Sequence, residues 1–323
     1  MSAESREEIL TRLEHIERTE DVRVLYAIES GSRAWQFAST DSDWDCRFLY
    51  VRPVSWYLRP TWRYRPDDSR DVIERREGPW DLEGWDLAKA CHLLANSNPT
   101  LVEWINSPRR YIDRDIRGAL WAAALECIDA RALQQHYWHM ARQNFQNYIK
   151  GRSAVRLKKY LYVLRPLFAL RQLETGNPFP SLDFMHVFRH AQRVEPRLED
   201  PVCLEVRNLV ARKQGGLEAG EADPIVLLDQ WIGAELERQR EVIGVRPALR
   251  PPLIERTDLL FRDTLKRMTE TARWDPVERF SEVAELVVER CRRAAYAGCL
   301  TCKGEGLSDN EGTVCACARV GNP

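Results

Sequence analysis

Asp43 and Asp45 are the residues whose types and spacing first indicate chemistry. They lead into the apolar residues Phe48-Leu-Tyr-Val51, so we expect a strand over 44–51. Residues two apart on a strand point to the same face. Two carboxylates on one face repel each other, which raises their pKa and costs stability unless a cation lies between them. Carboxylates suit hard ions such as Mg²⁺ or Mn²⁺, so the pair predicts a divalent-metal site.

Gly31-Ser32 supplies a complementary half of the site. It follows an apolar run over 22–28 that predicts another strand. Glycine lets the backbone approach a ligand, and turn N–H groups with a hydroxyl can hold phosphate oxygens. A phosphate cradle beside a metal-binding acid pair predicts phosphoryl or nucleotidyl transfer. The alternative is that Asp41, Asp43 and Asp45 form a solvated turn before an edge strand.

The run Glu29-Ser-Gly-Ser-Arg-Ala-Trp35, with Asp41-Ser-Asp-Trp-Asp45 and then Arg47-Phe48, resembles the DNA polymerase β nucleotidyltransferase superfamily. It is most similar to a predicted-nucleotidyltransferase branch, some members of which are associated with phage RNA ligases. The resemblance implies transfer of a nucleoside monophosphate from an NTP such as ATP, with Mg²⁺ or Mn²⁺ on Asp43 and Asp45. Gly31, Ser32 and Arg33 are the expected nucleotide-binding residues of the turn. Relatives carry glycine where this chain has Gln36, so we expect a local difference there.

The resemblance also implies an α+β fold, in which a small mixed sheet flanked by helices precedes an all-helical domain over the cleft. A third metal-binding carboxylate should come from a later strand. We expect strands over 71–77 and 79–84, and Asp81 is our choice as third ligand and proton acceptor. Glu83 shares the parity of Asp81 and stays an alternative. Asp86 is the other alternative, although a carboxylate there suits the start of the next helix.

A basic and aromatic helix is predicted over 155–167, in a run that resembles the same family. We expect Lys159 and Arg165 to contact the triphosphate and Tyr162 to stack on the base or sugar. The alternative is an ordinary amphipathic helix whose lysines extend to solvent.

Several further polar residues have weaker signals. Glu103 is a candidate support for the site, and Asn98-Pro99 with Ser107-Pro108 matches the family pattern without a catalytic role. His136 and His139 share a helix face and form a candidate metal pair, although satisfied or solvent-facing histidines are the commoner case. Whether Arg212-Lys213 lies near the site is not visible in one sequence.

The C-terminal tail predicts a separate, structural Zn²⁺ site. Cys299-Leu-Thr-Cys302, followed by Lys-Gly-Glu-Gly306, resembles one cysteine-rich repeat of DnaJ-type proteins. Thiolates bind Zn²⁺ tetrahedrally, and Cys315 with Cys317 would complete the set. The second pair is Cys-x-Cys and departs from the family pattern; the alternative is a tail of reduced thiols.

We therefore predict four segments: a nucleotidyltransferase core over 1–115, a helical nucleotide-capping domain over 116–245, a helical extension over 246–298 and a zinc knuckle over 299–323. The other expected helices cover 5–16, 34–38, 86–95, 100–105, 183–192, 202–213 and 223–242, with two each in 116–149 and 255–297.

The whole composition describes a cytoplasmic protein without membrane partners. The net charge is −1, so there is no basic excess to imply binding of long nucleic acid. No run of about 18 apolar residues predicts a membrane span. Cys46, Cys91, Cys127 and Cys203 are expected to be reduced core thiols. No feature predicts the oligomeric state.

The acceptor is the open question. An RNA end or a tRNA, a protein hydroxyl and a small molecule fit the residues equally well, although an RNA end suits the ligase association. Two other classes compete with the enzyme: a non-catalytic nucleotide or nucleic-acid binder that uses the zinc knuckle for contacts, and a structural adaptor.

Overall fold

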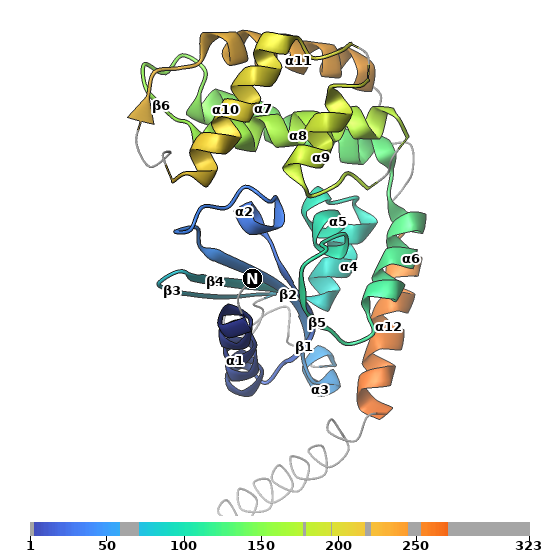
Figure 1. The fold of residues 1–323 in the computed structure, drawn as a ribbon. Coiled ribbons are helices and arrows are strands. Elements are labelled where there is room, and N and C mark those ends of the chain that lie inside the picture. The colour runs from blue at the N-terminus through green and yellow to red at the C-terminus, as the bar shows by residue number, and fades with distance from the viewer. Residues whose placement is uncertain are drawn as a thin grey trace, which may run out of the picture. The chain divides into compact units, whose positions relative to one another are not determined.

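The computed structural model describes residues 3–58, 71–176, 179–194, 196–216, 221–244 and 253–270 (Figure 1). The chain divides into two compact units, Met1–Arg52 with Arg63–Leu265 and Pro53–Trp62 with Lys266–Pro323. In the second unit, the described residues are 53–58, which contain the short helix α3 (Val54–Tyr57), and 266–270 at the end of α12 (Ile254–Glu270). Everything else below concerns the first unit.

A five-stranded sheet with the strand order β3-β4-β2-β1-β5 forms the base of the first unit. Its strands are β1 (Arg23–Glu29), β2 (Trp44–Val51), β3 (Val72–Glu77), β4 (Trp80–Asp86) and β5 (Arg110–Asp113). β2 and β4 are parallel, and every other neighbouring pair is antiparallel. The expected α+β fold with a small mixed sheet is confirmed.

One face of the sheet packs against α1 (Ala3–Glu20). The helix places apolar residues three and four apart, which gives it one apolar stripe. These residues form a single buried cluster with the strands, and its members include Ile9, Leu13, Ile16, Val24, Phe48 and Leu82. Gly84 belongs to this face as well, because an added Cβ would lie 2.1 Å from the ring of Phe48.

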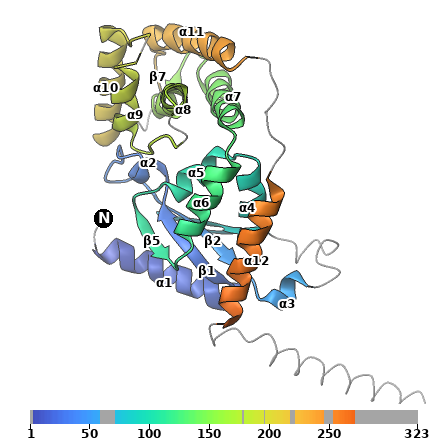
Figure 2. The ribbon, with the colours of Figure 1, turned by 90° about the vertical axis from the view of Figure 1, so that its right-hand side faces the viewer.

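The opposite face packs against α4 (Leu87–Ala95) and α5 (Pro99–Ile105) (Figure 2). The Trp104 ring on α5 stacks on Trp85 of β4 at 4.0 Å between centroids. The hydroxyl of Tyr26 on β1 donates to the carbonyl of Trp104 at 3.1 Å. Asp86 caps α4, because its carboxylate accepts from the Ala88 N–H at 2.8 Å, so the expectation that Asp86 begins this helix is confirmed.

β3 and β4 form a hairpin with the shortest usual connection. Glu77 pairs with Trp80, which leaves Gly78-Pro79 as a two-residue turn. Gly78 has a φ of +56°, a value that L-residues rarely adopt. Glycine at the first central position of such a turn therefore fixes the register of the hairpin.

The rest of the first unit is mostly helical. α6 (Arg117–Cys127) contacts α4 and α5, and four other helices contact α8 (Lys158–Glu174): α7 (Ala130–Tyr148), α9 (Phe184–Ala191), α10 (Asp200–Gln214) and α11 (Val226–Ile243). Figure 2 shows α8 end-on, with α7, α9, α10 and α11 around it. Two-residue strands β6 (Val155–Arg156) and β7 (Glu221–Ala222) pair antiparallel, so the expectation that this part is all-helical is wrong in this detail.

An ion cluster lies inside these helices. Arg171 on α8 donates to both carboxylate oxygens of Glu235 on α11, at 2.9 and 2.8 Å. Arg238 donates to Glu235 at 3.0 and 2.7 Å and to Glu174 at 3.0 and 2.7 Å. The buried charges are thus fully hydrogen-bonded, as burial of charge requires.

Several expected elements shift when they meet the structure. β2 has the expected bounds, whereas the short helix expected over 34–38 is α2 (Gly31–Ala34). β5 was not expected, because two charged residues flank its two apolar ones and obscure the alternation. The helix expected from residue 155 begins at Lys158, after β6. The predicted domain boundaries stay predictions.

The four scattered cysteines, Cys46, Cys91, Cys127 and Cys203, are buried and free, as expected of core thiols. Among the described helices, none combines the length and the apolar character that a bilayer crossing requires. The predicted zinc residues Cys299, Cys302, Cys315 and Cys317 lie outside the described residues. The second helix expected in 255–297 also lies outside them.

Candidate active site

The Gly-Ser turn lies directly against the second aspartate of the acid pair. Gly31 follows β1 with a φ of +58°, and a Cβ added to it would lie 1.9 Å from Oδ2 of Asp45. The neighbouring Ser30 N–H donates to the Asp45 carbonyl at 2.8 Å. Only glycine therefore lets the turn pass so close to this carboxylate, and Ser32 beside it is nearly buried.

Asp45 and Asp81 are brought together by the parallel pairing of β2 and β4. The two residues are direct partners in the register, so their side chains share a face. Arg47 stands between them: its Nη2 lies 3.4 Å from Oδ1 of Asp45 and its Nη1 lies 3.3 Å from Oδ1 of Asp81. Its Nε is 3.9 Å from Oε2 of Glu83. One guanidinium thus serves three carboxylates on this face.

Asp43 occupies the more exposed end of the acid set. It precedes β2, and its carboxylate is half exposed and 3.8 Å from the Arg76 guanidinium. Arg76 is the β3 partner of Asp81, so Asp43 faces the same hairpin. Asp43, Asp45 and Asp81 therefore lie where the two interior strands β2 and β4 begin.

Burial and neighbouring charges hold the pKa of Asp45 above its ordinary value. Burial is the largest cause, Arg47 opposes it, and the carboxylates of Asp81 and Asp43 add to it. Within the described ranges, no three His, Cys, Asp or Glu side chains already converge as a ready-made metal centre. The oxygen donors are nevertheless of the type that Mg²⁺ and Mn²⁺ prefer.

Glu29 supports Asp45 from beneath, a role that sequence reasoning missed. Its side chain is fully buried, where Tyr111 donates to one carboxylate oxygen and the Asp45 N–H donates to the other at 3.2 Å. Burial raises the pKa of Glu29 to about 7, and the Tyr111 hydrogen bond offsets only part of the effect. The Ser107 hydroxyl donates to the Glu29 carbonyl at 3.1 Å. The position of Glu29 at the head of the motif was the only available signal.

Arg33 is engaged with the loop that leads to Asp43. Its guanidinium lies 3.7 Å from the Trp44 ring centroid and donates to the carbonyls of Asp43 at 3.0 Å and Ser42 at 2.6 Å. Gln36, where we expected a local difference from the family, has a φ of +66°. The turn at Gln36 therefore has a backbone conformation that glycine adopts most readily, and the expected difference stays a prediction.

The helical part reaches the turn through Trp35. The Tyr162 ring on α8 meets Trp35 edge-on at 5.3 Å, and the Arg165 guanidinium lies 4.5 Å from the Trp35 ring centroid. Arg165 is buried and pairs with Glu103 at 2.7 Å, and the Tyr137 hydroxyl donates to Glu103 at 2.9 Å. In this structure the Arg165 charge is therefore already paired, and Glu103 acts on it rather than on the aspartates.

Lys159 and Lys213 take different positions around the same turn. The Nζ of Lys159 lies 3.9 Å from the ring centroid of Tyr148 and 5.4 Å from that of Tyr162, both exposed rings. Lys213 on α10 is buried, and its Nζ donates to the hydroxyls of Ser39 and Ser42 at 3.3 Å each. Lys213 thus lies at the loop between the two halves of the motif, which the sequence left open.

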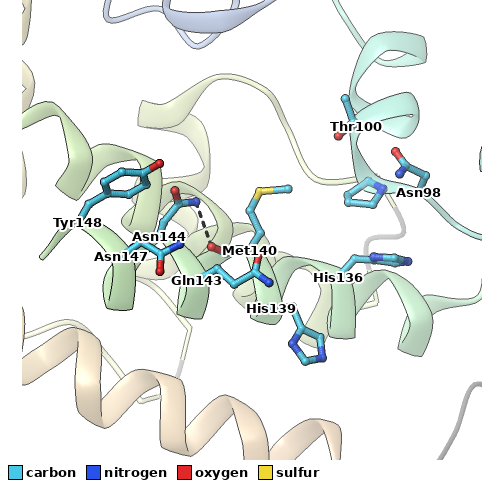
Figure 3. A pocket seen from close by; sticks show the side chains of 10 residues that line it. Asn98, Thr100, His136, His139, Met140, Gln143, Asn144, Asn147 and Tyr148 are labelled. Atoms are coloured by element: carbon cyan, nitrogen blue, oxygen red, sulfur yellow. Dashed lines mark hydrogen bonds between the residues drawn. The ribbon is translucent and has the colours of Figure 1, made fainter. Parts of the chain in front are cut away.

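His136 and His139 both lie on α7 and line a groove beside α5 (Figure 3). Burial lowers the pKa of His136. Among the described residues, no third His, Cys, Asp or Glu joins this pair. Its metal role has no support from the geometry.

Comparison with known proteins identifies the kind of protein that carries this arrangement. Residues 5–263 match the family described as "RlaP: RNA repair pathway DNA polymerase beta family". An uncharacterised protein of Bacillus subtilis (strain 168), YcgL, is 34% identical over 265 residues, which are 81% of this chain and 97% of that protein. A nucleotidyltransferase-like protein from Exiguobacterium sibiricum 255-15 is similar at 15% identity over 82% of this chain and 90% of its own. Its TM-score is 0.28, so this last likeness carries no argument.

Proposed function

Because the chain belongs to the RNA repair pathway DNA polymerase beta family of nucleotidyltransferases, we propose that it transfers an NMP from an NTP to a hydroxyl or phosphate acceptor at an RNA end. The observation that carries the proposal is the contact between Gly31 and Asp45 together with the register of Asp45 opposite Asp81. The phosphate cradle and the acids thereby form one site instead of two separate surfaces.

The acids fit the divalent ions that enzymes of this superfamily use. Asp43, Asp45 and Asp81 would hold Mg²⁺ or Mn²⁺. Glu83, which lies 3.9 Å from the Arg47 guanidinium, stays an alternative metal ligand. A bound divalent ion would neutralise charge on the phosphates and on the leaving group. The register that pairs Asp45 with Asp81 supports this fit, because it brings two carboxylates side by side on one face of the sheet.

The chain's own residues then position the reactants. The backbone at Gly31 and the Ser32 hydroxyl bind phosphate oxygens, and Asp81 accepts the proton of the acceptor hydroxyl. The acceptor oxygen bonds to the α-phosphorus while the bond from that phosphorus to the β-phosphate bridging oxygen breaks, and pyrophosphate leaves. Catalysis is mainly positioning and charge neutralisation.

Lys159 and Tyr162 supply the helical side of the nucleotide site. Both lie within reach of Trp35 at the turn, through the Tyr162–Trp35 contact and the Lys159–Tyr162 contact. Arg165 would reach a phosphate only after leaving Glu103, so we place it as a residue that positions Trp35. Arg33, which holds the Asp43 loop, would act on the nucleotide through that loop.

The test is pyrophosphate release with each of the four NTPs, Mg²⁺ or Mn²⁺, and RNA oligonucleotides that end in a hydroxyl or a phosphate. We expect release that depends on metal and RNA, and its loss in Asp43→Asn with an unchanged melting temperature. Glu237→Gln, in an exposed pair far along α11, is the control for a carboxylate substitution. Turnover by Asp43→Asn at the wild-type rate would refute the assignment, and nucleotide binding without turnover would favour the non-catalytic binder.

A further inference from the structure

A groove of about 600 Å³ runs between the start of α5 and the outer side of α7 (Figure 3). Tyr148 lies at one end and Asn98 with Thr100 at the other, as the figure shows. Its volume lies within the range of about 300–1,000 Å³ that is usual for ligand sites. The groove is therefore large enough for a specific occupant.

The lining is neutral and rich in amides. Gln143, Asn144 and Asn147 follow one another along α7, and no Asp or Glu is among the residues that line the groove. Each amide offers both a donor and an acceptor, and Asn144 uses one donor on the Met140 carbonyl at 3.0 Å. Amides of this kind recognise base edges and sugar hydroxyls, while the lack of carboxylates spares a phosphate backbone from repulsion.

The Tyr148 end of the groove leads to the candidate active site through a row of rings and one cation. Tyr148 is 44% exposed, and Lys159 bridges it to Tyr162. Tyr162 meets the Trp35 ring, and the backbone N–H of Trp35 donates to the Gly31 carbonyl at 3.0 Å. The contacts are unbroken from the groove to the turn that is proposed to hold the NTP phosphates.

Exposed aromatic rings beside cations are the usual means of binding single-stranded nucleic acid. A base stacks on the ring, and the cation meets the phosphate. Arg156 and Lys158 lie close enough to Lys159 to add positive charge, although the chain as a whole has a net charge of −1. A duplex would not offer its bases to Tyr148, since they are already stacked on one another.

We propose that this groove binds the single-stranded RNA acceptor upstream of its reacting end, with Tyr148 stacking on a base and the α7 amides reading sugars and base edges. The inference rests on the proposed function and adds where and in which form the acceptor binds. The site is separate from the aspartates, so RNA binding and chemistry can fail independently.

The experiment measures fluorescence anisotropy of a labelled single-stranded RNA 12-mer on the full chain, without NTP and at one salt concentration. Tyr148→Ala should weaken binding by about 5- to 100-fold, the effect of losing one base–aromatic stack. Tyr148→Phe keeps the ring and should bind like the wild type. Gln146 is exposed on the same helix and is not part of the groove lining. Gln146→Ala is therefore the matched control and should bind like the wild type.

Three outcomes would overturn the inference: wild-type RNA affinity in Tyr148→Ala, equal loss in Tyr148→Phe, or duplex RNA binding as tightly as the single strand. Equal affinity for a DNA 12-mer of the same sequence would overturn the assignment to RNA. Asp43→Asn should keep RNA affinity while losing transfer. If Tyr148→Ala binds RNA like the wild type while the wild type still transfers, only the groove proposal is wrong. If RNA binding depends on Tyr148 but the wild type shows no turnover, only the proposed reaction is wrong.

Discussion

Arginines meet carboxylates in two regions of this molecule, around Arg171 inside the helices and around Arg47 on the middle strand of the sheet. In the helices, two arginines face two glutamates at hydrogen-bond distances of 2.7–3.0 Å. On the sheet, one arginine faces three carboxylates at 3.3–3.9 Å. The first arrangement has as many arginines as glutamates, whereas the second has one arginine for three carboxylates, with Arg76 only near the neighbouring Asp43 at 3.8 Å.

The carboxylate pKa values of the two regions shift in opposite directions, downwards for Glu235 and upwards for Asp45. Burial would raise the pKa of Glu235, but hydrogen bonds from Arg238 and Arg171 overcome it and lower the pKa to about 2. Burial raises the pKa of Asp45, and the single arginine does not overcome it. The region around Arg171 is thus balanced in charge, and the region around Arg47 is not.

The largest effect is expected from Asp45→Asn, which removes a carboxylate from the unbalanced region. Transfer should fall by more than about 100-fold, the upper range for residues that only support a metal ligand. Stability should stay or rise, because one source of repulsion with Asp81 is gone. Pyrophosphate release and thermal melting measure both; a large fall in melting temperature would mean that Asp45 is structural and that the contrast between the regions is false.

The next effect is expected from Glu235→Gln in the balanced region. It leaves the buried Arg171 without its charge partner, which should cost about 3–5 kcal/mol of unfolding free energy. Urea denaturation measures the loss. Glu237→Gln, whose pair with Arg240 is largely exposed at 3.5 Å, should be close to neutral and controls for the substitution itself.

Glu29 and Glu235 should make opposite contributions to the pH dependence of the unfolding free energy. The folded pKa of Glu29 is about 7, above its ordinary 4.5, so its contribution is present at low pH and lost as the pH rises from about 4.5 to 7, by about 3 kcal/mol at most. The folded pKa of Glu235 is about 2, so its contribution is present above about pH 4.5 and lost as the pH falls towards 2.

Unfolding free energy as a function of pH checks this contrast. Glu29→Gln should flatten the decline between about pH 4.5 and 7, and Glu235→Gln should flatten the decline on the acid side. Identical pH profiles for Glu29→Gln and the wild type would show that Glu29 is ionised in the folded protein and that the acid beneath Asp45 is already balanced.

The smallest effect on stability is expected from a pair of glycines with the same backbone conformation. Gly31 and Gly78 have φ values of +58° and +56°, but only Gly31 has a neighbour within 4 Å of an added Cβ. Each alanine should cost about 1–2 kcal/mol for the left-handed conformation. Gly31→Ala should lose transfer in addition, because its Cβ displaces the Asp45 carboxylate; if both variants keep wild-type transfer, the turn does not position Asp45.

Much of the fold could be predicted because local patterns encode it. The apolar run from Phe48 predicted β2 with its observed bounds, and the parity of Asp81 with Glu83 indicated that they share a face. The roles of the aspartates as metal ligands, and of Gly31, Ser32, Arg33, Lys159, Tyr162 and Arg165 in nucleotide binding, stay predictions. The same holds for the zinc tail.

What could not be predicted depends on contacts between residues distant in sequence. The Arg165–Glu103 pair, the Glu29–Tyr111 hydrogen bond and the reach of Lys213 to Ser42 across 171 positions leave no periodic signal. Arg165 was expected to contact phosphate because the sequence of a basic and aromatic helix does not show which basic residue has a buried partner. Arg47 likewise has a role only because β4 pairs beside β2.

The two-residue turn Gly78-Pro79 fixes the length of the connection between β3 and β4, although neither residue has a reactive group. Asp81 reaches Asp45 because the turn holds β4 in one alignment with β3 and β2. One inserted residue in the connection would reverse the facing of every side chain on β4. Asp81 would then lie on the same face of the sheet as Phe48. Insertions and deletions near residue 78 should therefore be tolerated far less than substitutions.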